Sequence, residues 1–265
     1  MNIRSLFACA ALLAAPLFAK TETLWASGVN AQEGWYDFNK SRNRQDSELC
    51  WAITAANLIA WWQDTRPAED LPAGVPVGEA VWSTYRASFA NCGSDPDEGM
   101  RWWFSGQYAP LMSEDGAPYA EITNSANGHY YTAMYPQADA FVWGLLSRAR
   151  GVQVNAQSLT QMLYQGFSKG SAFWIGVDYF RPDGLRYTHS LTVWGVDYEC
   201  DANKHPRIVA IYMTDSDDGQ RYLHRIPVKV VDNKLLFDCP QHPIYAAIGY
   251  IEITAITQLK ARLKK

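Results

Sequence analysis

Three residues that lie far apart in the sequence have the side chains of a thiol nucleophile, its base and the group that orients the base. Cys50 comes first, His189 begins the run His-Ser-Leu-Thr-Val-Trp-Gly, and Asp215 lies in the run Thr-Asp-Ser-Asp. In such a site a thiolate attacks a carbonyl, a histidine moves the proton, and a carboxylate fixes the histidine tautomer. These residues, in this order, indicate a cysteine enzyme.

Cys50 is expected in the first turn of a helix. Apolar residues recur at helical spacing over 49–60, Asp46 or Ser47 can cap the start, and a Pro- and Gly-rich stretch from Pro67 ends the helix. A helix N-terminus carries partial positive charge and free N–H groups, which favour a thiolate and can face an oxyanion. A cysteine taken alone is more often a small buried apolar residue. The functional interpretation therefore depends on the expected position of Cys50 in the first turn of a helix.

His189 is expected on a β-strand, at the rim of the core. Thr188 and Ser190 flank it with polar side chains, while Leu191 and Val193 continue its own face into apolar surroundings. A lone histidine on a strand is more often structural than catalytic. The other histidines lie in polar or turn contexts and are expected on the surface: His129, His205, His224 and His242.

Asp215 and Asp217 lie two residues apart in a polar segment. The functional interpretation puts Asp215 on the imidazole of His189, and the simpler alternative is a polar turn. A calcium loop would need further acidic ligands and a terminal Glu, which this segment lacks. No pair of Cys or His residues has the spacing of zinc ligands, so we expect no metal site.

Lys40 lies ten residues before Cys50, in the run Trp-Tyr-Asp-Phe-Asn-Lys that begins at Trp35. This run is expected to be ordered and partly buried, although most lysines are solvated surface groups. A cation at this position can stabilise a developing oxyanion.

The order of predicted elements indicates an α+β domain. Helices and long loops are expected over residues 79–170, including a short amphipathic helix over 158–167. The chain then turns β-rich and antiparallel. Strands are expected near residues 172–179, 186–198, 207–214, 221–230 and 244–254.

The first nineteen residues have the pattern of a cleaved signal peptide. Arg4 precedes an apolar, Ala-rich stretch over 6–17 that is too short to span a bilayer, and Ala19 is the expected cleavage site. No later stretch is long and apolar enough for a membrane helix. Residues 20–265 are then expected to form a single domain of a secreted or periplasmic protein.

Composition and cysteine count narrow the class further. A hydrophobic fraction of 48% with 19% charged residues is typical of a globular protein, and the net charge of −4 gives no basic field for nucleic acid. An exported protein can hold disulfides. Cys200 follows one expected strand and Cys239 precedes another, so Cys200–Cys239 is the preferred bridge, while the state of Cys92 stays open.

Three blocks of the chain resemble the IdeS/Mac family of immunoglobulin-degrading cysteine proteases. The first runs from Gly-Trp-Tyr-Asp at residue 34 to Trp-Trp at 62, and the other two cover 189–197 and 210–217. The resemblance implies a papain-like fold and no cofactor. It also implies roles for five residues: Cys50 as nucleophile, His189 as general base, Asp215 as its orienting group, Asp217 as a second carboxylate and Lys40 in the oxyanion hole.

The implied function is that of a secreted cysteine endopeptidase, a thiol protease of the kind that serves as a virulence factor. Its substrate would be a protein such as immunoglobulin heavy chain. The segment between His189 and Asp215 is a few residues longer than the family pattern, at a hairpin loop over 200–206. Two alternatives stay open: a transglutaminase-like or deamidating thiol enzyme, and a catalytically silent module that binds a host protein through exposed aromatic residues. The oligomeric state is open too.

Overall fold

The computed structural model describes residues 20–41, 43, 45–109, 121–150, 154–180, 186–238 and 250–261. The expected signal peptide lies outside the described residues, and so do Cys239 and His242. Cys200 is a free thiol in the structure, so the predicted Cys200–Cys239 bridge is not formed. Within the described residues, no helix is long and apolar enough to cross a membrane.

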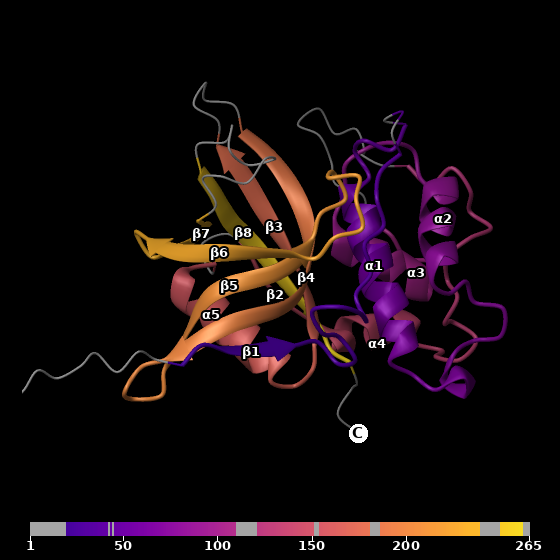
Figure 1. Cartoon of the computed structure of the whole chain (residues 1–265). Helices are drawn as coiled ribbons and strands as arrows, with labels where there is room; N and C mark the ends of the chain where they lie inside the picture. Colours follow the sequence, from indigo (N-terminus) through magenta and orange to yellow (C-terminus); the bar gives the residue numbers. More distant parts are fainter. Residues whose placement is uncertain are drawn as a thin grey trace, which may run out of the picture.

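In the first half of the chain, α2 and α3 pack against the helix α1, and α4 packs against α3 (Figure 1). The apolar residues of α1 recur as predicted, but its polar face is buried as well: every residue from Trp51 to Gln63 is shielded from solvent. α1 contacts α2, α3 and the strand β4, so it lies between other elements on all sides. The helices are α1 (Cys50–Asp64), the 3-10 turn η1 (Ala68–Asp70), α2 (Glu79–Ser88), α3 (Pro96–Ser105) and α4 (Ala138–Leu145).

The start of α1 differs from the prediction in one respect. Cys50 is the first helical residue, as expected, but Leu49 is the N-cap and no side chain caps the helix. Asp46 instead accepts hydrogen bonds from the backbone N–H of Ser41, at 2.8 Å, and from its hydroxyl. The prediction of a cap by Asp46 or Ser47 is therefore wrong, because Asp46 folds back on the segment that carries Lys40.

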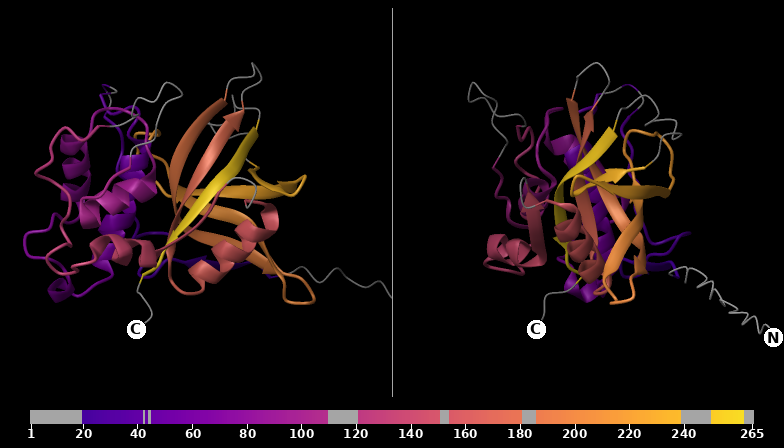
Figure 2. Two further views of the ribbon diagram at one scale, coloured as in Figure 1. Left: turned by 180° about the vertical axis from the view of Figure 1, so that it is seen from behind. Right: turned by 90° about the vertical axis from the view of Figure 1, so that its left-hand side faces the viewer.

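The second half forms an antiparallel sheet that closes into a barrel, seen beside the helices in Figures 1 and 2. Six strands follow one another in the order β4-β3-β8-β7-β6-β5, and β5 pairs again with β4 to complete the ring. The helix α5 (Ala156–Phe167) packs against several of these strands. The strands are β3 (Ala172–Phe180), β4 (Arg186–Cys200), β5 (Pro206–Thr214), β6 (His224–Val231), β7 (Lys234–Phe237) and β8 (Tyr250–Leu259).

The long strand β4 connects the two halves of the molecule. It pairs with β3, with β5 and also with the N-terminal strand β1 (Glu22–Trp25). The pairing with β5 shifts register between Val193 and Gly195, which leaves Trp194 as the extra residue of a bulge. Glycine is needed after the bulge, since a Cβ on Gly195 would lie 2.4 Å from the Trp25 ring.

Side chains of α1 bind directly to the inner part of β4. Thr54 donates its hydroxyl to the carbonyl of Ser190 at 3.1 Å, and the Asn57 amide donates to the Thr192 hydroxyl at 3.1 Å. Such bonds between buried groups fix one helix position against one strand position. The start of α1 is thereby held over the strand that carries His189.

The α+β class agrees with the structure, and the expected helix over 158–167 and the strands over 172–214 are present with small differences at their ends. Three short strands were missed: β1, β7 and β2 (Leu146–Arg150), which pairs with β8. The first half is therefore not purely helical. Strands of four or five residues are too short for a clear alternation of apolar and polar side chains.

Candidate active site

Cys50 and His189 meet where the beginning of α1 faces β4. Their side chains are hydrogen-bonded to each other, and the backbone of Ser190 also bonds the Cys50 sulfur. Burial opposes ionisation of the thiol, but the bond to His189, together with the charges of His189 and Lys40, outweighs it and lowers the pKa of Cys50. The thiol therefore ionises more readily than an ordinary cysteine.

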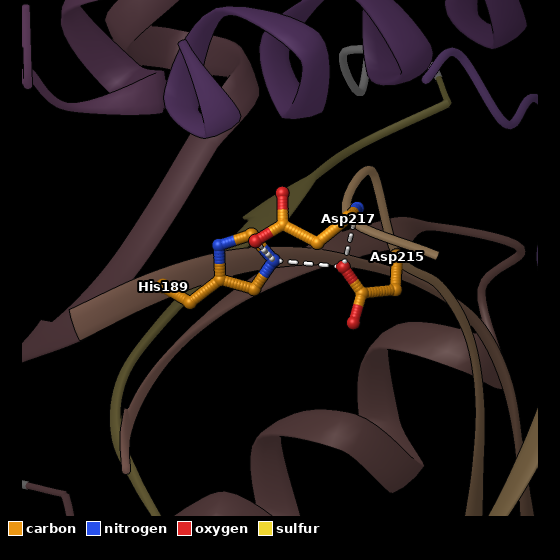
Figure 3. A group of neighbouring side chains, drawn as sticks. All are labelled: His189, Asp215 and Asp217. Atoms are coloured by element: carbon orange, nitrogen blue, oxygen red, sulfur yellow. Dashed lines mark hydrogen bonds and ion pairs between the residues drawn. The ribbon is translucent and has the colours of Figure 1, made fainter. Parts of the chain in front are cut away.

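The ring of His189 is held between Cys50 and Asp215. The imidazole is only 5% exposed, and Nε2 lies 2.8 Å from Oδ1 of Asp215 (Figure 3). Burial alone would lower the pKa of His189, but the charge and hydrogen bond of Asp215 and the bond to Cys50 raise it well above its ordinary value. A lowered thiol pKa beside a raised imidazole pKa favours a thiolate–imidazolium pair.

Asp215 lies immediately after β5, at the start of a tight loop. Its carboxylate is almost completely buried, and its Oδ1 also accepts the backbone N–H of Asp217 at 2.9 Å (Figure 3). One carboxylate oxygen thus holds both the imidazole and the turn that follows. This bond makes the position of Asp215 depend on the conformation of the loop.

Lys40 reaches the same loop from the segment before α1. Its Nζ lies 2.5 Å from Oδ1 of Asp217, and its backbone N–H donates to the Ser216 carbonyl at 3.0 Å. The Lys40 side chain is only 14% exposed, whereas Asp217 is 45% exposed. Oδ2 of Asp217 lies 4.0 Å from Nε2 of His189. Asp217 therefore stands between the Lys40 ammonium and the imidazole.

All five residues that the sequence singled out are thus close together, although they come from a loop, a helix, a strand and a second loop. Sequence reasoning missed the side chains that hold these segments in place. The Thr214 hydroxyl accepts from the Trp194 indole at 3.0 Å and donates to the Tyr36 carbonyl at 3.1 Å, and Asn57 accepts the Phe38 N–H at 3.0 Å. A polar residue in an otherwise apolar run, such as Asn57, is the signal that could have found them.

A cleft of about 600 Å³ opens beside the site. Lys40 and Asp217 form one wall with the adjoining loop, Ser47 and Glu48 precede the helix, and Tyr187 comes from β4. Tyr187 is 48% exposed although it is a large aromatic residue. The cleft therefore borders the site on the side where Lys40 and Asp217 lie.

His189, Asp215 and Asp217 also bring three potential metal-ligand atoms within 4.8 Å of one another. The chemistry of the group does not suit a cation. Lys40 already neutralises Asp217, and His189 is hydrogen-bonded to Asp215. The arrangement fits orientation and protonation of an imidazole better than metal binding.

One expectation about the histidines is wrong. His224 is buried, 8% exposed, because the loop after β5 folds over the start of β6 and places Asp218 against it at 2.5 Å. His129 and His205 are exposed, as expected. Among the described residues, Cys50, Cys92 and Cys200 are free thiols.

Comparison with known proteins gives two matches. A model of the family described as Mac 1 matches residues 20–69, a range that includes Lys40 and Cys50. A protein named IgM protease, from Streptococcus suis (strain P1/7), is 25% identical over 234 residues, which cover 75% of this chain. The chain spans 19% of the length of that relative. Both matches support the resemblance to the IdeS/Mac family.

Proposed function

We propose that this protein is a cysteine endopeptidase that cleaves a peptide bond of a protein substrate. The observation that carries the proposal is the contact of Cys50 with His189, whose other ring nitrogen is bonded to Asp215. The shifts of both pKa values favour a thiolate at neutral pH, which is the form that attacks a carbonyl.

In the first half of the reaction, the Cys50 sulfur attacks the carbonyl carbon of the scissile bond and a negative charge develops on its oxygen. The backbone N–H groups of the first turn of α1 have no acceptor within the helix, so that of Cys50 can donate to this oxygen. Lys40 supplies a cation, held near the site by Asp217. His189 then gives its proton to the leaving amine, and the C–N bond breaks to leave a thioester on Cys50.

In the second half, water replaces the amine. His189, now neutral, takes a proton from the water as it attacks the thioester, and the thiolate leaves with the carboxylic acid as product. Asp215 acts in both halves, because its bond to Nε2 keeps the other ring nitrogen directed at the sulfur. In this scheme Asp217 acts through Lys40.

The substrate that we propose is immunoglobulin heavy chain. The name of the relative from Streptococcus suis and the family match over residues 20–69 support this choice. The cleft beside Lys40, with a volume of about 600 Å³, has room for several residues of an extended segment. We also propose a papain-like arrangement, since a nucleophile at a helix start faces a histidine on a barrel strand, and export by the leader over residues 1–19.

A direct test is incubation of purified immunoglobulin M and immunoglobulin G with the protein, followed by mass spectrometry. We expect new heavy-chain termini with the wild type and none with Cys50→Ala. Release of ammonia or a new isopeptide bond without new termini would instead indicate the transglutaminase-like or deamidating reaction. Binding without any covalent change would indicate a silent module, and either result would overturn the proposal.

A further inference from the structure

A second His–Asp pair lies behind the loop that carries Asp215 and Asp217. Nε2 of His224 is 2.5 Å from Oδ2 of Asp218, and the two side chains are only 10% and 3% exposed. His224 begins β6, and Asp218 is three residues after Asp215. No step of the proposed reaction uses this pair, yet burying two ionisable groups has a free-energy cost that must be offset.

The Asp218 carboxylate fixes the shape of the loop and its position. Oδ1 accepts the backbone N–H of Gln220 at 2.8 Å, which closes the turn, while Oδ2 binds His224 on the barrel. The Gln220 carbonyl accepts from the Asn39 amide at 2.8 Å, next to Lys40. The loop is therefore tied to β6 on one side and to the Lys40 segment on the other.

A third buried carboxyl lies close to this pair. Asp37 is 9% exposed; its Oδ2 accepts the Tyr222 N–H at 2.8 Å, and its Oδ1 has no hydrogen-bond partner within the described part of the chain. Burial raises the pKa of Asp37 to about 8, with a smaller contribution from the charges of Asp218 and Asp215 and against the opposing effect of the Tyr222 N–H.

At neutral pH, Asp37 is therefore protonated. The charged groups that face it are Asp215 and Asp218 from the loop, which repel a carboxylate, and Arg221, which attracts one. The Arg221 guanidinium lies over the Trp35 ring, 5.7 Å from its centroid. A neutral Asp37 avoids the repulsion that a carboxylate at this position would have with Asp215 and Asp218.

We propose that Asp218 and His224 are positioning residues that hold the 215–219 loop so that Asp215 stays against His189, and that Asp37, buried beside them, belongs to the same arrangement. The inference rests on the proposed function only through the Cys50–His189 pair. Asp37, Asp218 and His224 extend the candidate site from five residues to eight. The physical reason is that Asp215 lies in a loop whose backbone is fixed by the turn around Asp218, and a shift of about 1 Å is enough to weaken catalytic geometry.

The test measures alkylation of Cys50 by iodoacetamide as a function of pH, which requires no protein substrate. Asp218→Asn and His224→Gln nearly keep side-chain size and remove the His–Asp contact. When Asp215 is displaced, His189 loses its raised pKa, so we expect the apparent pKa of Cys50 to rise by about one unit and its alkylation rate at pH 6 to fall roughly tenfold.

A matched control is available on the surface of the barrel. Asp201 and His205 form a His–Asp pair at 3.2 Å that is 51% and 77% exposed, in the β4–β5 hairpin. Asp201→Asn and His205→Gln should leave the alkylation profile unchanged. If Asp218→Asn and His224→Gln fold with wild-type near-UV circular dichroism and alkylate like the controls, the inference is wrong. The proposed protease function would still stand, because cleavage by the wild type tests it separately.

The part assigned to Asp37 is tested separately by hydrogen exchange of the amides of residues 216–220. At pH 9 the wild type should lose protection in this loop, beyond the change in chemical exchange rate, because ionised Asp37 repels Asp215 and Asp218. Asp37→Asn should keep the protection that it has at pH 7. Equal protection of both proteins at pH 9 would overturn this part.

Discussion

Two buried His–Asp pairs of this molecule have the same chemical groups and different surroundings. His189–Asp215 and His224–Asp218 bond through Nε2 at 2.8 and 2.5 Å, and their aspartates belong to one loop. The first imidazole has a thiol on its other side, while the second lies behind the loop. In the proposed mechanism, the first pair differs from the second by its third neighbour, a cysteine at a helix start, which gives the imidazole a nucleophile to activate.

The largest expected effect follows from removing that third neighbour. Cys50→Ser should abolish peptide cleavage, because a hydroxyl beside this imidazole has no lowered pKa to make it a nucleophile. The fold should persist, since Ser is close in size to Cys and suits a helix start. Steady-state cleavage of the heavy chain and circular dichroism check both points, and residual turnover in Cys50→Ser would remove Cys50 from the mechanism.

A smaller but still large effect is expected at the partner of the first pair. Asp215→Asn changes the hydrogen bond that fixes the His189 tautomer, a change that lowers kcat by about four orders of magnitude in a related triad. The same substitution in the second pair, Asp218→Asn, should cost far less, roughly tenfold. The ratio of the two kcat values measures the contrast between the pairs, and equal losses would show that both act only on folding.

Lys40 is expected to act on the transition state. Lys40→Ala should lower kcat and kcat/KM together by about two to three orders of magnitude with KM little changed, which is the effect of losing one oxyanion donor. Asp217→Asn releases the Lys40 ammonium and should give a milder loss of the same kind. A raised KM with an unchanged kcat in Lys40→Ala would show that the lysine binds substrate and does not stabilise the transition state.

The smallest effect concerns stability and pH. Because the pKa of Asp37 is raised to about 8, the folded state keeps a proton that the unfolded chain releases near pH 4. Stability therefore falls as pH rises from about 4 to about 8 and stays reduced above that range. Asp37→Asn should unfold like the wild type at pH 4 and at a higher temperature at pH 9, measured by thermal melts at both pH values.

The local features of the site could be predicted from the sequence, whereas the contacts between segments could not. Helical spacing put Cys50 in a first turn, and strand patterns put His189 and Asp215 on neighbouring strands. The pairing of β3 with β8, two strands far apart in the sequence, has no local signal. Neither does the salt bridge from Lys40 to Asp217, two residues far apart in the sequence.

The errors have the same origin. Asp46 is a residue type that often caps helices, but its carboxylate accepts hydrogen bonds from Ser41, in the loop before the helix. His224 has polar neighbours along the chain, yet the loop that begins at Asp215 covers it. Local sequence reports which conformations a segment favours, and burial depends on which distant segment folds against it.

The central claim is that Cys50 is a thiolate prepared by His189, and competitive labelling within one molecule tests it most directly. The protein is treated with limiting iodoacetamide at pH 6, and the fractions of Cys50, Cys92 and Cys200 that react are read by peptide mass spectrometry. We expect Cys50 to react at least about tenfold faster than the other two thiols, and the difference to disappear in His189→Ala. Equal labelling of Cys50 and Cys92 in the wild type would contradict the account.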